Sequence, residues 1–289
     1  MRNKIGLLLM AGVYLGSAAV AEAQLKMNPP KVLVIGREVV KPGKSAAHAK
    51  WEEGYPRANA KANWPTPYLA LSSITGESRA LFLFGYESMA AWEADVTAQG
   101  KNPALSAAGE ALDSKDGDFL SESKTAVFTL QDDLSYQPGV TVAGTRGFMI
   151  VSQTVKPGHG KHFEEIRKMI RAAHEKAGLT DHYAVYHATA GASGGLYLIF
   201  IPFKSLADVD QFPVVHGKAY QDALGQDGQN KLTEFNMQGL ESLETQLFVF
   251  SPKMSYPPKE WVEADHDFWA PKPAMPAKPA AEKKKKAKP

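Results

Sequence analysis

The sequence contains no cysteine among its 289 residues, and this absence removes several kinds of structure. An oxidising compartment would add no disulfide, and there is no thiol to carry a lipid anchor. The motifs Cys-x-x-Cys, His-Glu-x-x-His and the acidic calcium loop are also absent. Residues 191–195 have the spacing Gly-x-Ser-x-Gly, but they join two expected strands, whereas the hydrolase elbow joins a strand to a helix. Stability must therefore come from packing, and no standard motif names a reaction or a cofactor.

Long apolar runs are also scarce, and the most prominent one lies at the N-terminus. Arg2 and Lys4 precede the apolar stretch 5–19, and Ala21-Glu22-Ala23 follows it. This is the order of a secretory signal peptide, with a charged region, an apolar region and a small-residue cleavage site. The run is shorter than the roughly 18 residues that a membrane helix needs. We expect residues 1–23 to be removed, leaving a periplasmic or secreted protein without a transmembrane segment; an uncleaved anchor is the alternative.

An excess of basic charge is missing from the part of the chain that should fold. The formal net charge is only +2, and much of the positive charge lies in the lysines beyond Pro271, so the stretch 24–270 is mildly acidic. Nucleic-acid binding requires clustered Lys and Arg that contact phosphates. We therefore expect no nucleic-acid partner.

The C-terminal segment is rich in Pro, Ala and Lys. It begins at Pro257-Pro258 and includes the run Lys283 to Lys286. Such a composition offers too little apolar surface to offset the entropy of ordering, so we expect residues 257–289 to form a flexible tail. Its lysines indicate either a weak electrostatic contact with the anionic cell envelope or simply a solvated tail.

What the sequence does contain is an internal repeat. The motif Val-Lys-Pro-Gly occurs at 40–43 and again at 155–158, each time after an apolar run. Other identical pairs share the same offset: Ala58 and Ala173, Lys61 and Lys176, Tyr68 and Tyr183, Gly76 and Gly191, Ser78 and Ser193, Leu81 and Leu196, Leu83 and Leu198. A shared frame of this length is hard to obtain by chance. We interpret the chain as a tandem duplication with repeats at 30–137 and 145–256.

Each repeat predicts the order strand, helix, strand, strand, helix, strand. In the first repeat these elements are expected at 32–40, 45–63, 68–74, 80–86, 88–112 and 124–130, with Pro56 splitting the first helix and Asn102-Pro103 breaking the second. In the second repeat they are expected at 147–155, 159–177, 182–188 and 196–201, then as helical segments at 206–212, 217–224 and 230–240, and finally at 243–250. The glycine-rich stretch 191–195 joins two strands, so it indicates a hairpin turn rather than a phosphate-binding loop.

This element order is the ferredoxin-like arrangement, with a four-stranded antiparallel sheet and both helices on one face. In the strand 196–201 both alternating sets of side chains are apolar, which is typical of strands buried on both faces. A second sheet must then cover the face away from the helices. We predict an α+β fold in which two tandem βαββαβ repeats pack sheet to sheet as an intramolecular α+β barrel.

The element order and the segments 81–92 and 196–209 resemble the dimeric α+β barrel superfamily. This superfamily includes antibiotic biosynthesis monooxygenases, haem-degrading monooxygenases and chlorite dismutases, and the resemblance covers both repeats. It implies a small or planar ligand held between the sheet and the helices of one unit. Because the superfamily hosts many activities, the resemblance predicts the fold and not a reaction.

Histidines distinguish the second repeat from the first. The second repeat holds six of the eight: His159, His162, His174, His182, His187 and His216. His174 and His187 replace Asn59 and Ser72 of the first repeat, and we take them as candidate catalytic residues. If both point between helix and sheet, they could bind a metal or haem or act as acid and base near neutral pH. Alternatively, His174 only interacts favourably with the helix dipole near the end of its helix, and His187 only forms a local hydrogen bond.

Aromatic residues of the second repeat suggest a ligand pocket. The candidate ligand-binding residues are Tyr183, Tyr186, Tyr197, Phe200 and His216. The aromatic rings could line a pocket for an aromatic or lipid-like molecule, or they could be ordinary core residues. His159, His162 and Glu165 have a spacing that could place metal ligands on one helical face, but they lie at an expected helix start, where exposed polar residues are common. We therefore expect no metal site.

Three functions remain open. The first is an exported protein that binds a small apolar or aromatic ligand between the helices and sheet of the second repeat. The second is a monooxygenase-like or haem-handling oxidoreductase, cofactor-independent or haem-dependent, that uses histidines of the second repeat. The third is a cell-envelope interaction module attached through its Lys-rich tail.

Overall fold

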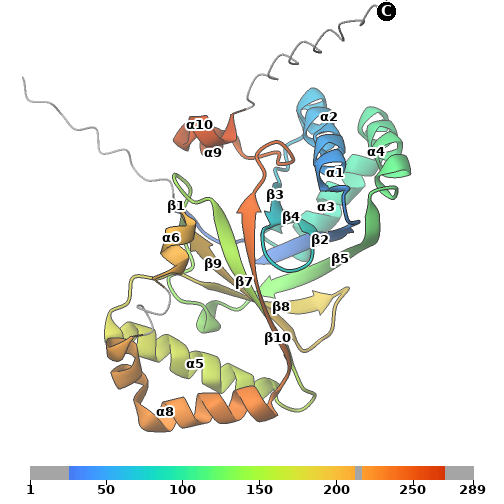
Figure 1. The fold of residues 1–289 in the computed structure, drawn as a ribbon. Helices are drawn as coiled ribbons and strands as arrows, with labels where there is room; N and C mark the ends of the chain where they lie inside the picture. Colours follow the sequence, from blue (N-terminus) through green and yellow to red (C-terminus); the bar gives the residue numbers. More distant parts are fainter. Residues whose placement is uncertain (1–25, 212–216, 271–289) are drawn as a thin grey trace, which may run out of the picture.

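The computed structural model describes residues 26–211 and 217–270 (Figure 1). The expected signal peptide, His216 and the lysine run of the tail lie outside these residues. Within them, eight antiparallel strands form one closed barrel in the order β10-β3-β4-β2-β5-β8-β9-β7. No helix in the described residues is both long enough and apolar enough to cross a membrane.

The order strand, helix, strand, strand, helix, strand occurs twice along the chain. The first half contains β2 Val32–Val40, α1 Ser45–Glu52, α2 Gly54–Ala62, β3 Leu69–Ser73, β4 Arg79–Tyr86, α3 Met89–Gly100, α4 Pro103–Asp116 and β5 Leu120–Leu130. The second half contains β7 Gly147–Val155, α5 Gly160–Ala177, β8 Ala184–Ala190, β9 Leu196–Phe203, α6 Leu206–Val209, α8 Lys218–Gln238 and β10 Leu240–Phe250. The segment between the halves contains the 3₁₀ helix η1 Asp132–Leu134 and the short strand β6 Val140–Thr141. Strand β6 pairs with β1 Lys26–Met27, which precedes the first half.

The halves are joined edge to edge. Within the first half the strands run β3-β4-β2-β5, and within the second they run β8-β9-β7-β10, so each half has the strand order of a ferredoxin-like sheet. Strand β5 pairs with β8, and β10 pairs with β3, which leaves no free edge in the barrel. The prediction of an α+β barrel is therefore confirmed, although the two sheets are hydrogen-bonded into one rather than only facing each other.

Two apolar layers follow from the alternation of side chains along the strands. One set points into the barrel, where residues of both halves form a common core that includes Leu33, Leu83, Phe148 and Phe200. The other set points outward under helices: α5 and α8 cover the second half, and α1 to α4 lie over the first (Figure 1). Strands buried on both faces explain why both alternating sets are apolar.

The helix boundaries follow local chemistry. Helices α1 and α2 are separate, as the sequence predicts, because Pro56 has no N–H to donate to Glu52. Ser88 accepts a hydrogen bond from Ala91 N at 3.1 Å and begins α3, while Asn102 accepts one from Leu105 N at 3.1 Å and begins α4. In the second half, α8 Lys218–Gln238 is kinked at Gly225, whose φ of 69° and ψ of 169° are not helical, so the helix is interrupted close to the break that the sequence predicts between two helical segments.

Glycine at the β8–β9 turn is required by a close approach. Gly191 has φ +77°, and a Cβ there would lie 2.3 Å from Thr125 O on β5. A side chain at this position would clash with backbone and strain the left-handed conformation. The segment 191–195 is thus a hairpin turn against the neighbouring half, as predicted.

The prediction of a flexible tail from residue 257 is wrong for its first part. Residues 259–264 form α9 and residues 266–269 form α10. Trp261 and Trp269 are buried and belong to the core of the barrel, where Trp269 packs on Phe250 with ring centroids 5.3 Å apart. The prolines of the segment suggested disorder, but the two tryptophans supply the apolar surface that offsets the entropy of ordering.

Candidate functional site

The candidate residues of the second half do not form one site, because the sheet separates them. Tyr183 and Tyr197 lie on the outer face with His174, in the apolar layer beneath α5 and α8. Tyr186 and Phe200 belong to the core inside the barrel. The prediction that all of them lie between helix and sheet is therefore wrong for Tyr186 and Phe200.

His174 is a buried residue held by its neighbours. It lies near the end of α5 with 2 % of its surface exposed. Its Nδ1 is 2.8 Å from Ile170 O, and its Nε2 is 3.1 Å from Asp181 Oδ2. The rings of Tyr136 and Tyr183 lie against it, each with its centroid 5.3 Å away. Both ring nitrogens therefore already have partners within the protein.

Arg167 lies in the same layer and was not predicted. Its guanidinium is buried 4.9 Å from the centre of the Tyr183 ring, and burial lowers its pKa. No carboxylate of the described residues forms an ion pair with it, and neither its Nε nor the Tyr183 hydroxyl has a hydrogen-bond partner there. Burial also raises the pKa of Tyr183 to about 12. The buried hydroxyl therefore stays protonated at neutral pH.

His187 lies apart from His174, on the outer face of β8. Its Nε2 is 2.7 Å from Gly194 O, and its ring stacks on Tyr197 with centroids 4.3 Å apart. His174 contacts Ile170 and Asp181, whereas His187 contacts Gly194 and Tyr197, so these contacts do not bring the two histidines together. Their predicted catalytic roles therefore remain predictions.

A largely apolar cavity opens at one end of the barrel, and we call it the apolar mouth. Its volume is about 220 Å³. It is lined by Met27, Asn28, Pro29, Pro30, Leu33, Pro67, Tyr68, Leu69, Leu83, Gly85, Glu87, Pro138, Val140, Phe148, Ala184, Tyr186, Phe200, Pro202, Pro258 and Trp261. Both halves and the C-terminal segment therefore contribute to it.

Tyr186 and Phe200 are fixed in the wall of the apolar mouth. Their rings meet edge to face at 5.6 Å, and Phe148 meets Phe200 in the same way at 5.5 Å. The Tyr186 hydroxyl donates to Pro30 O at 2.9 Å. Because burial raises the pKa of Tyr186, this donor stays protonated. The wall is therefore rigid, with one hydroxyl already occupied.

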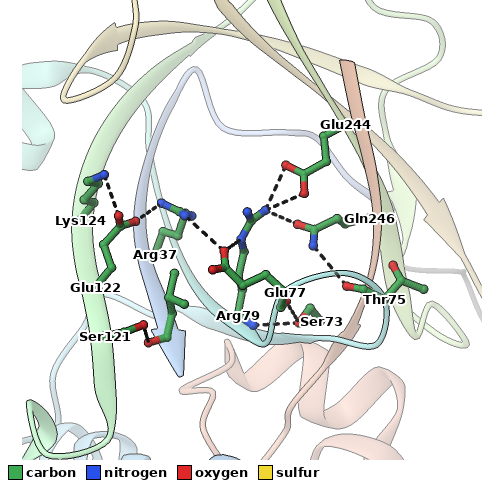
Figure 2. A network of polar contacts seen from close by, with 11 residues as sticks. Arg37, Ser73, Thr75, Glu77, Arg79, Ser121, Glu122, Lys124, Glu244 and Gln246 are labelled. Atoms are coloured by element: carbon green, nitrogen blue, oxygen red, sulfur yellow. Dashed lines mark hydrogen bonds and ion pairs between the residues drawn. The ribbon is translucent and has the colours of Figure 1, made fainter. Parts of the chain in front are cut away.

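The opposite end of the barrel holds a second cavity, of about 290 Å³, which we call the polar mouth. Arg79 lies at its centre and donates to Glu77 at 2.9 Å and to both carboxylate oxygens of Glu244 at 3.2 Å (Figure 2). Arg37 contacts Glu122, which also accepts from Lys124 at 2.9 Å. Each of these cations has a carboxylate partner, so the polar mouth has no excess positive charge for an anionic ligand.

Comparison with known proteins agrees with this architecture. No protein-family model and no curated protein matches the sequence. A putative monooxygenase from Fusobacterium nucleatum subsp. nucleatum superposes with a TM-score of 0.52 at 14% identity, covering 78% of this chain and 94% of the other. An anthrone oxidase-like protein gives 0.51 at 10% identity, with coverage of 78% and 94%. A mutant chlorite dismutase from Candidatus Nitrospira defluvii gives 0.45 at 9% identity, with coverage of 84% and 97%.

This chain has the dimeric α+β barrel fold. Identities this low establish the fold alone, so the reaction or ligand of an α+β barrel must be argued from its own residues.

Within this α+β barrel, sequence analysis missed a polar cluster in the first half. Glu38 on β2, His48 and Glu52 on α1, and Asp116 at the end of α4 meet under the helices. Only His48 and Glu52, four residues apart on one helix, gave a signal in the sequence. Glu38 and Asp116 join them through the tertiary fold. The second half holds six histidines and the first holds only His48, so the distribution of histidines points away from this cluster.

Proposed function

We propose that this protein binds a small apolar or aromatic ligand in the apolar mouth of its barrel. The observation that carries the proposal is the cavity of about 220 Å³ whose wall is formed largely by proline, aliphatic and aromatic side chains. An apolar cavity of about 150 Å³ is enough to hold a single benzene ring. The volume therefore suits a ligand with one or two rings, which would bury apolar surface and stack on Phe200 or Trp261.

This proposal moves the ligand from the place that the sequence suggested. The layer between α5 and the sheet is occupied by packed side chains, among them Phe163, Tyr183 and Tyr197. Tyr186 and Phe200 instead line the space inside the barrel. Because successive residues of a strand point to opposite faces, a sequence pattern cannot tell which of two apolar faces holds a ligand.

We infer that the chain arose as a tandem duplication, so that one polypeptide supplies both sheets of the barrel. The matching strand orders support this inference, as do the positive φ angles of Gly43 and Gly158 in the two Val-Lys-Pro-Gly segments. A cavity lined by both halves would then be asymmetric. That asymmetry would let one mouth become apolar and the other polar.

The binding proposal is tested with the neutral fluorescent probe 1-aminonaphthalene, which has two fused rings, and a pair of matched variants. Ala184→Leu fills the apolar mouth, and Ala126→Leu adds the same side chain to the wall of the polar mouth. We expect Ala184→Leu to weaken probe binding about tenfold or more, equivalent to about 1.4 kcal/mol, and Ala126→Leu to leave it unchanged. Equal affinity for both variants, with each folded by circular dichroism, would reject the assigned cavity.

A monooxygenase-like reaction without a cofactor is a second candidate. The unpartnered polar groups of Arg167 and Tyr183 beside the His174–Asp181 pair favour it, because such groups can contact a polar substrate. The residues do not fit haem ligation, since Nε2 of His174 and Nε2 of His187 are each occupied by a protein oxygen. Oxygen uptake with a quinol, lost in His174→Gln and in Arg167→Met but kept in His187→Ala, would support this alternative.

We further propose that the protein is exported and that its lysine-rich tail adds a weak attraction to the envelope. The mass of the protein purified from its host would show removal of residues 1–23. A protein ending at Ala270 should then leave envelope fractions at lower salt than the full chain. Equal retention of the two forms would argue against attachment through the tail.

A further inference from the structure

The polar cluster of the first half has the geometry of a metal site. Glu38, His48, Glu52 and Asp116 each offer one ligand atom, and these four atoms lie within 4.8 Å of one another. The His48 Nε2 atom is 2.8 Å from Glu38 Oε2, 3.9 Å from Glu52 Oε1 and 3.8 Å from Asp116 Oδ1. Ligand atoms that share one ion at about 2.1 Å stand roughly 3 to 4 Å apart. Small side-chain rotations would therefore place one cation between all four.

The second observation is that two oxygens of the cluster are buried without partners. Glu52 is 3 % exposed and Asp116 is 7 % exposed, yet Glu52 Oε1 and Asp116 Oδ1 have no hydrogen-bond partner within the part of the chain that the structure describes. Both atoms face Nε2 of His48, which is 2 % exposed and has at most one proton there to share. Buried polar atoms are normally satisfied, and a buried carboxylate without a partner is costly.

Among the described residues, no lysine or arginine forms an ion pair with Glu38, Glu52 or Asp116. The ring of Phe119 meets that of His48 edge to face, with centroids 6.4 Å apart. Among these residues, His48 is therefore the only basic side chain paired with the three carboxylates.

We propose that Glu38, His48, Glu52 and Asp116 bind one divalent first-row metal ion such as Mn²⁺, Fe²⁺ or Zn²⁺. One imidazole nitrogen and three carboxylate oxygens form a donor set that these ions accept, and no thiolate is present to favour a softer ion. The four ligands come from β2, α1 and α4, and α1 lies beside α4 in the first half (Figure 1). The ion would therefore fasten these helices to the sheet, in a site independent of the apolar mouth.

The test uses the full chain without a polyhistidine tag, stripped with chelator and then titrated with Mn²⁺ or with Zn²⁺. We expect one ion per chain by calorimetry, confirmed by elemental analysis after dialysis. At a metal concentration about one hundred times Kd, the melting temperature should rise by about 5 to 10 °C. The absence of bound metal, or binding without a rise in melting temperature, would overturn the proposal.

A matched pair of variants locates the ion. Glu52→Gln keeps the shape of the side chain and removes a ligand charge, whereas Glu53→Gln changes the adjacent residue, whose carboxylate pairs with Arg57 outside the cluster. We expect Glu52→Gln to bind metal at least about a hundredfold more weakly, and Glu53→Gln to bind like the wild type. In the metal-free state Glu52→Gln should melt no lower than the wild type, because it removes a buried acid. Equal metal affinity in the two variants would place the ion elsewhere, for example at the surface histidines of the second half.

Discussion

The hydroxyl of Tyr186 donates a hydrogen bond to the carbonyl oxygen of Pro30 at 2.9 Å. Tyr186 lies on the inner face of β8, and Pro30 belongs to the segment that precedes β2. Both residues line the apolar mouth. The bond therefore fixes the first-half rim of the mouth to a strand of the second half.

Removal of this bond should lower stability by a modest and measurable amount. Tyr186→Phe keeps the aromatic ring but leaves Pro30 O without its donor, so we expect the free energy of unfolding in urea to fall by about 1 kcal/mol. Tyr183→Phe is the matched control, because the Tyr183 hydroxyl is buried and has no hydrogen-bond partner in the described residues. That control should be neutral or slightly stabilising. A larger loss in Tyr183→Phe than in Tyr186→Phe would contradict this assignment.

The C-terminal helices α9 and α10 should contribute to the stability of the folded barrel. A chain that ends at Tyr256 loses the buried Trp261 and Trp269, and a chain that ends at Ala270 keeps both. Loss of one buried tryptophan side chain costs about 3 to 5 kcal/mol, so the shorter chain should melt far below the wild type. The chain ending at Ala270 should melt like the full protein. Equal melting temperatures for both truncations would contradict the role of α9 and α10.

Lowering the pH should weaken the contacts by which Asp265 holds α10 against Gly144 and Arg146. Burial opposes ionisation of Asp265, but hydrogen bonds from Gly144 N and from Arg146, 2.7 Å away, outweigh it and hold its pKa below the usual value. Because the folded pKa is the lower one, ionised Asp265 contributes stability above the unfolded pKa of about 3.9, and this contribution is lost as pH falls through the folded value.

This linkage is measured from melting temperatures between pH 3 and pH 7, a range that spans the unfolded pKa of about 3.9. Asp265→Asn should melt lower than the wild type at pH 7 and should lose less of its stability on acidification. The control Asp267→Asn changes an exposed carboxylate two residues further along and should follow the wild type. Parallel curves for Asp265→Asn and the wild type would show that the Asp265 charge does not matter.

Polar contacts in the polar mouth should stabilise the packing of β10 against the first half. Arg79 on β4 is only partly exposed and bridges to Glu244 and Gln246 on β10 (Figure 2). Arg79→Met leaves these acceptors without their donor, and we expect it to lower the free energy of unfolding by about 1 to 3 kcal/mol. Arg57 on α2 forms a more exposed pair with Glu53, which precedes that helix, so Arg57→Met should cost about 0.5 kcal/mol or less. Similar losses in both variants would argue against a special role for Arg79.

The fold was predictable from the sequence because its pattern occurs twice. Local signals such as Pro56 indicate where a helix divides, since a missing N–H acts within one turn. The apolar alternation also indicated that both faces of the sheet are buried. What it could not indicate was which face holds a cavity, so Tyr186 was assigned to the same space as Tyr183.

The sites depend on tertiary contacts that leave little trace in the sequence. Glu38 and Asp116 are distant in the chain and approach His48 only when α4 packs beside α1. Trp261 follows two prolines and precedes a lysine-rich stretch, so composition concealed its burial in the barrel. In both cases one or two residues determine the local structure, and neither the composition nor the periodicity of the surrounding segment identifies them.

The central claim is that the ligand site lies inside the barrel. The most direct measurement is a crystal structure of the protein with 1-aminonaphthalene bound. We predict density for the probe in the apolar mouth, between Tyr186 and Trp261. Density beneath α5 beside His174 and Tyr183, with the apolar mouth empty, would contradict this account.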